Sequence, residues 1–126
     1  MEMIDPYLGG TQGPRESIEL FVSWRKLKDL DYAGKSDPVC HVYVKNDSRS
    51  EWIFVGMTEV IQDCLEPDFT TSIKSHYYFE KNQEIRFEIY DDDGSSKEEQ
   101  GMITTKIATL IGSKNQTYVG KLTHSK

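Results

Sequence analysis

The chain has 126 residues, of which 37% are apolar, and a formal net charge of −6. This length suits one domain with one hydrophobic core, and the negative charge argues against non-specific binding to nucleic acids. The mean hydropathy of −0.61 and the absence of a long apolar run argue against a membrane-spanning segment.

The N-terminal residues 1–16 contain three glycines and two prolines without any periodicity. We therefore expect a flexible leader there and the folded domain over 17–126. The leader also lacks a basic region followed by an apolar run, which argues against a secretory signal. Cys40 and Cys64 fit buried thiols of a reducing compartment better than a disulfide, so we expect a cytoplasmic protein.

The sequence suggests seven strands separated by turns, and the segments 17–24, 39–45 and 84–90 show the alternation of apolar and polar residues that is typical of half-buried strands. In the first of them, Ile18, Leu20, Val22 and Trp24 alternate with more polar residues. The seven suggested strands are 17–24, 39–45, 52–58, 70–79, 84–90, 101–110 and 117–122. No segment has a convincing helical period, so the sequence predicts an all-β antiparallel sandwich.

The fifth expected strand runs directly into three consecutive carboxylates at 91–93. Side chains two positions apart in a strand point the same way, so Asp91 and Asp93 are expected to lie close together. Two ionised carboxylates at close range repel each other unless they are solvated, shift their pKa or share a cation. Ca²⁺ takes roughly six to eight oxygen ligands, and a second acidic pair, Asp31 and Asp37, stands in the first loop to complement them.

Other chemistries fit the sequence less well. A carboxylate-rich loop is often only a solvated turn, because Asp supports turns through hydrogen bonds to the nearby backbone. An EF-hand loop with Gly94 at its sixth position puts Ile89 and Gln100 at its two ends, where acidic ligands are required. The histidines and cysteines are scattered, which argues against zinc, and no nucleophile is paired with a base. We therefore do not expect an enzyme.

Several motifs resemble those of C2 domains. The segment LDYAGKSDP at 30–38 is similar to their first calcium-binding loop, 65–69 is similar to their second loop, and 90–93 is similar to the start of their third loop. More narrowly, the chain resembles the first C2 domain of copines, in order over about 17–122. The motifs that carry this closer resemblance are KSDPVC at 35–40, TEVI at 58–61 and YYFEKNQEIRFE at 77–88.

The resemblance implies a Greek-key sandwich of seven to eight strands, with loops at one end that bind Ca²⁺ and then anionic phospholipid. The side-chain ligands that it implies are Asp31, Asp37, Asp91, Asp93 and Glu99. The last position has an alternative, because counting forward from Asp93 gives Glu99 whereas counting back from Gly101 gives Glu98. Two ions are expected, and Glu in place of the family's Asp argues against a third.

The same resemblance implies that Tyr32, Lys35 and Lys97 contact lipid. The third loop offers no bulky apolar tip, so we expect mainly electrostatic, salt-sensitive binding to anionic surfaces of the phosphatidylserine kind. The protein is then expected to move from the cytoplasm to the inner face of the plasma membrane when calcium rises.

Copines close this sandwich with a further strand and continue into other domains, so the chain is expected to be a fragment that lacks its last strand. A second hypothesis stays open, namely a calcium-independent protein–protein interaction domain with vestigial acidic loops. Replacing Asp91 and Asp93 by Asn separates the two hypotheses, because only the first needs the carboxylates.

Overall fold

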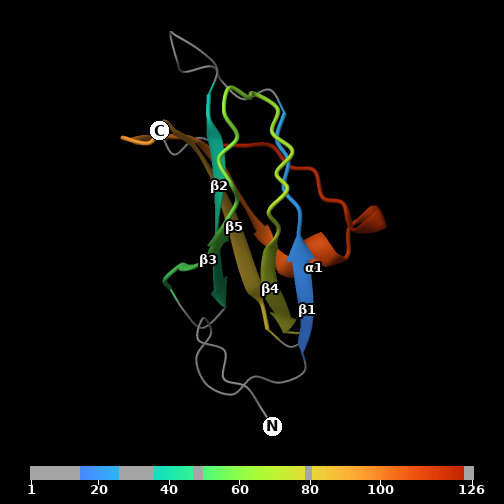
Figure 1. Cartoon of the computed structure of the whole chain (residues 1–126). Coiled ribbons are helices and arrows are strands. Elements are labelled where there is room, and N and C mark those ends of the chain that lie inside the picture. Colours follow the sequence, from blue (N-terminus) through green and yellow to red (C-terminus); the bar gives the residue numbers. More distant parts are fainter. Residues whose placement is uncertain (1–14, 26–35, 47–49, 79–80, 124–126) are drawn as a thin grey trace.

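The computed structural model describes residues 15–25, 36–46, 50–78 and 81–123, and its strands form two antiparallel sheets (Figure 1). The larger sheet has the order β3-β2-β5-β6, and the smaller one pairs β1 with β4. The elements are β1 (Arg15–Leu20), β2 (Pro38–Asn46), β3 (Ile53–Met57), β4 (Ile73–Tyr78), β5 (Gln83–Asp92), β6 (Lys97–Lys106), the helix α1 (Ile107–Ile111) and the 3-10 turn η1 (Lys114–Gln116). The predicted all-β antiparallel class is confirmed, with six strands in the described part of the chain.

The core lies between the two sheets and is built mainly by β2 and β5. These strands alternate as the sequence predicts: Val42 and Val44 of β2 point inward, and they pair across the sheet with Phe87 and Ile85 of β5. Outward residues such as His41 are only partly covered. The buried apolar cluster consists of Val22, Cys40, Val42, Val44, Phe69, Ile73, Ile85, Phe87, Ile89 and Ile107.

The C-terminal half of the expected strand 101–110 is a helix. Strand β6 ends at Lys106 and α1 follows directly. Ile107, Leu110 and Ile111 all pack against the core, and this spacing of three and four residues suits one face of a helical turn. The expectation of a continuous strand was therefore wrong from Ile107 onward.

The expected strand 117–122 is also absent from this described part of the chain. Val119 is 88% exposed and Tyr118 is 39% exposed, whereas Leu122 packs against the core. Thr123, directly after the segment, forms an isolated bridge with Met102 of β6. The expectation of a strand there was therefore wrong, since none of the described strands forms a ladder with this segment.

The first strand is shifted relative to its expected range. Strand β1 begins at Arg15, inside the expected leader, and ends at Leu20. Val22 and Trp24 still pack on the core beyond the end of β1, and Ser23 forms an isolated bridge with Asp68. The apolar alternation was therefore a correct guide to burial but not to where the strand ends.

Both cysteines are free thiols, as expected. Cys40 is fully buried in β2, whereas Cys64 is half-buried in the loop between β3 and β4. Within the described residues, no helix has the length and apolar character needed to cross a membrane.

Candidate metal centre

The start of β2 and the end of β5 bring two of the predicted ligands into contact. The strands are antiparallel, and Pro38 pairs with Asp91, so the residue before β2 meets the end of β5. The backbone N–H of Asp37 donates to Asp91 Oδ1 at 2.9 Å, and the N–H of Asp92 donates to the Asp37 carbonyl oxygen at 3.0 Å. Asp91 is 5% exposed. A buried carboxylate thus anchors the end of the first loop.

The loop between β3 and β4 reaches the same place. The N–H of Asp63 donates to Asp37 Oδ1 at 2.8 Å, and the N–H of Cys64 donates to the Ser36 carbonyl oxygen at 2.8 Å. Asp63 has a φ of 52°, a conformation that Asp tolerates better than most residues. Asp63 is not among the ligands predicted from the sequence, because one acid in a plain turn carries no distinctive signal.

Asp93 occupies the hairpin between β5 and β6, and its carboxylate turns back on that hairpin. Asp93 Oδ1 accepts hydrogen bonds from the N–H of Ser96 at 2.9 Å and from the N–H of Ser95 at 3.0 Å. These bonds, with the N–H of Ser96 contributing most, hold the pKa of Asp93 below its usual value. Asp93 therefore stays ionised on an exposed tip, next to Gly94, whose φ of 94° suits glycine.

The register of β5 and β6 distinguishes the two candidates for the fifth ligand. Asp91 pairs with Glu98, whereas Tyr90 pairs with Glu99. Directly opposed residues of an antiparallel pair lie on the same face of the sheet, so Glu98 shares the face of Asp91 and Glu99 shares that of Tyr90. Burial, the Glu88 carboxylate and, to a smaller extent, the Glu99 carboxylate raise the pKa of Tyr90. The choice stays a prediction, and the register favours Glu98.

The complete ligand set cannot be assembled from the described residues. Asp31, Tyr32 and Lys35 lie outside them. Among the residues that are described, no group of three or more His, Cys, Asp or Glu side chains is arranged to hold a metal ion. The predicted lipid contact Lys97 is described; it is exposed at the start of β6 and pairs with Asp92. The ligand and lipid-contact assignments therefore stay predictions.

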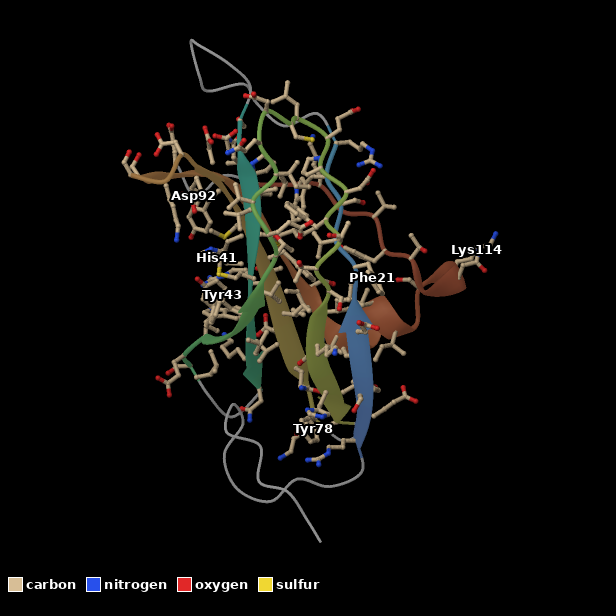
Figure 2. All side chains as sticks on the ribbon, viewed as in Figure 1. Phe21, His41, Tyr43, Tyr78, Asp92 and Lys114 are labelled. Carbon is tan, nitrogen blue, oxygen red and sulfur yellow. The ribbon has the colours of Figure 1, made fainter. Side chains whose placement is uncertain are left out.

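The outer face of the larger sheet carries a second group of side chains, which we call the aromatic face: His41, Tyr43, Trp52, Phe54, Arg86, Glu88 and Tyr90. Figure 2 shows His41 and Tyr43 on one side of the domain and Asp92 above them, at the end opposite Tyr78. The Arg86 guanidinium lies 4.5 Å from the centre of the Trp52 ring and 5.6 Å from that of Tyr43.

Glu88 is the charged centre of the aromatic face. It is 7% exposed, and its Oε2 lies 2.9 Å from Arg86 Nε, while the Tyr90 hydroxyl donates to its Oε1. Burial, and then the positive charge of Lys97, lower the pKa of His41 on the same face. The buried carboxylate thus has two partners, and the rings around it shield it from water.

A family model described as a C2 domain matches residues 19–122. The chain belongs to the C2 domain family. C2 domains typically bind membranes in a calcium-dependent manner and have no catalytic activity of their own. The expected membership is confirmed, and it agrees with the all-β fold and with loops that gather acidic residues at one end of this C2 domain.

The comparison with individual proteins supports the narrower resemblance to copines. The C2 domain is 35% identical to Copine-A of Dictyostelium discoideum, over 82% of this chain and 17% of that protein. It is 37% identical to Nicotinic receptor-associated protein 1 of Caenorhabditis elegans, over 64% of this chain and 15% of that protein. The chain thus spans about one sixth of the length of these relatives.

A solved structure shows the same fold. The calcium-bound pair of C2 domains of Extended-Synaptotagmin 2 matches with a TM-score of 0.57 and 20% identity, over 76% of this chain and 34% of that one. At this identity the likeness establishes the fold.

Proposed function

We propose that this C2 domain binds Ca²⁺ at the end where Asp37 meets Asp91, and that the bound ions attach it to anionic phospholipid. The observation that supports the proposal is the convergence of acidic loops on one point: the first loop ends at Asp37, the second contacts it through Asp63, and the third begins at Asp91. The proposed ligands are Asp31, Asp37, Asp91 and Asp93, with Glu98 or Glu99 as the fifth.

The charge of these loops explains why an ion is needed before lipid can bind. Residues 30–37 and 91–99 contain seven acids and two lysines, a formal charge of −5 that repels an anionic surface. Two Ca²⁺ ions would raise this charge to about −1, and their open coordination sites could accept lipid phosphate or carboxylate oxygens. Calcium therefore acts as a bridge as well as a charge switch.

The hairpin between β5 and β6 supports shallow docking on the membrane surface. Its tip, 94–96, consists of one glycine and two serines, all exposed. Without an apolar side chain to insert, attraction depends on charge and weakens with salt. A protein of this kind would stay in the cytosol at low calcium and reach the inner face of the plasma membrane, where anionic lipid is concentrated, when calcium rises.

Co-sedimentation with phosphatidylserine-containing liposomes tests this proposal. We expect sedimentation in Ca²⁺, none in excess chelator or in Mg²⁺, and a loss as salt increases from low to physiological concentration. Asp91→Asn should abolish the calcium-dependent fraction. Glu16→Gln is the matched control, because it also removes one negative charge but lies on β1 near Tyr78, at the far end of the domain.

A calcium-independent interaction domain is the second candidate function, and the aromatic face is the observation that favours it. Phe54 is 45% exposed and Met57, which follows it on β3, is 42% exposed. Aromatic, Met and Arg side chains are enriched at protein interfaces. Equal partitioning of wild type and Asp91→Asn in Ca²⁺ and in chelator would reject the calcium proposal and leave this one.

A further inference from the structure

Strand β6 contains a bulge next to the candidate metal centre. Ile89 pairs with Gly101 and Tyr90 pairs with Glu99, so Gln100 has no partner across the ladder. A bulge of this type turns the extra side chain away from its regular direction. Gly101 permits it with a φ of 154°. The result is that the polar side chain of Gln100 is only 2% exposed.

The buried amide of Gln100 contacts the first loop. Its Nε2 donates to Ser36 Oγ at 3.0 Å, between residues 64 positions apart in the chain. Ser36 is itself fully buried, and its carbonyl oxygen accepts the N–H of Cys64 from the second loop. The next residue is Asp37. Gln100 thus spans β5 and joins β6 to the segment that presents this predicted ligand.

The two polar atoms of the buried Gln100 amide differ in their hydrogen bonding within the described part of the chain. Gln100 Oε1 has no hydrogen-bond partner among the described residues. Burying a polar side chain costs free energy that its hydrogen bonds offset, so a buried glutamine depends on the bond that it makes to Ser36. The bond to Ser36 therefore accounts for a glutamine at this position, and its loss should destabilise the domain.

The bulge also decides which glutamate faces Asp91. With the extra residue, Asp91 pairs with Glu98. Regular pairing from Ile89 onward would instead place Glu99 opposite Asp91 and Gln100 opposite Tyr90. One residue therefore controls two features of the site: the identity of the opposing carboxylate and the position of the first loop.

We propose that Gln100 is a positioning residue for the metal centre: its bulge sets Glu98 opposite Asp91, and its amide fixes Ser36 and so Asp37. This inference rests on the proposed function, because it concerns calcium affinity. A single buried hydrogen bond of ordinary strength corresponds to about a three- to tenfold change in an equilibrium constant.

Calcium titration calorimetry of Gln100→Leu tests the inference, with Gln83→Leu as the matched control. Gln83 is also buried, at 3% exposure, and hydrogen-bonds Tyr78 N–H and the His76 carbonyl oxygen at the other end of β5. Both variants should lower the melting temperature in chelator. Only Gln100→Leu should weaken Ca²⁺ binding, by about fivefold, whereas a merely structural role predicts equal affinity for both folded variants.

Ser36→Ala removes the same hydrogen bond with a smaller change in volume and decides the question if Gln100→Leu does not fold. Ser36→Ala should weaken Ca²⁺ binding to a similar extent. The double variant should bind Ca²⁺ no more weakly than either single variant, because the two substitutions remove the same contact. Wild-type affinity in Gln100→Leu or Ser36→Ala overturns the inference and leaves the proposed function intact. Failure of the wild type to bind Ca²⁺ overturns both.

Discussion

Asp37 donates its backbone N–H to the carboxylate of Asp91 at 2.9 Å, across 54 positions of the sequence. Two predicted ligands are therefore held together by the fold itself, before any ion is present. One oxygen of Asp91 already has a donor, and the N–H of Asp63 donates to Asp37 Oδ1. Preorganisation of this kind reduces the ordering that binding would otherwise require.

Calcium should stabilise the folded domain by an amount that depends on the ratio of free Ca²⁺ to its dissociation constant. At a free concentration one hundred times the dissociation constant, one site adds about 2.7 kcal/mol to the free energy of unfolding, or about 10 °C in melting temperature. We expect this rise in thermal scans of the wild type and of Glu16→Gln. Asp91→Asn should lose most of it, and an undiminished rise in that variant would place the ion elsewhere.

The two glutamates of β6 should respond differently to charge removal. Because Glu98 pairs with Asp91 and Glu99 with Tyr90, Glu98→Gln should weaken Ca²⁺ binding at least about fivefold, whereas Glu99→Gln should change it by less than about twofold. Calorimetric titration of the two variants measures this difference. The reverse order would assign the fifth ligand to Glu99 and contradict the observed register as the guide to the site.

Glu59 should make stability depend on pH in the acid range. Burial alone would raise its pKa, but the N–H groups of Thr70 and Thr71 and the Thr70 hydroxyl, at 2.8 to 3.0 Å, lower it to about 2. Because the folded-state pKa is depressed, this contribution is complete above the unfolded value of 4.5 and is lost as the pH falls toward about 2.

The corresponding substitution tests that contribution. Glu59→Gln should lower the free energy of unfolding at neutral pH by about 1 kcal/mol, a figure that allows for its partial exposure to solvent. The free energy of unfolding, measured with urea, should also depend less on pH between pH 4.5 and 2 in this variant than in the wild type. The same pH dependence in the variant and the wild type would mean that other carboxylates dominate acid unfolding.

Arg86 should be important for stability because it is an ion-pair partner of a nearly buried carboxylate. Arg86→Met leaves Glu88 with the Tyr90 hydroxyl alone and should cost about 3 kcal/mol in urea unfolding. Adding Glu88→Gln to that variant removes the uncompensated charge and should recover more than half of the loss. A double variant no more stable than the single one would show that packing against Trp52 and Tyr43, rather than charge, explains the effect.

The sequence predicted the parts of the fold that repeat a simple pattern over many residues. The burial of β2 alternates over 41–46 and that of β5 over 83–87, so period and burial agree there, whereas 38–40 and 87–89 are buried without a break. The short segment after Lys106 could not be assigned in this way, because one helical turn and a few extended residues differ little in pattern. Whether Ile107 lies in a strand or a helix depends on the core that it meets.

For the candidate site, the sequence indicated which acids to consider but not how they are arranged. The spacing of Asp91 and Asp93 suggested side chains that act together, yet Asp93 turns back on its own hairpin. The bulge at Gln100 could not be predicted from the spacing of residues in the sequence, because an extra residue shifts the register of the strands without leaving a local sequence pattern. Such contacts, like that of Asp63 with Asp37, depend on tertiary structure and have no local signature.

The long pairing of β2 with β5 also bears on how the domain folds. The β5–β6 hairpin closes a loop of a few residues and can form early, whereas joining β2 to β5 must close a much longer one at greater entropic cost. The contact between Asp37 and Asp91 depends on this second pairing. If it forms after the rate-limiting barrier, calcium will leave the refolding rate nearly unchanged and will act by slowing unfolding, so that a calcium signal also lengthens the lifetime of the native state.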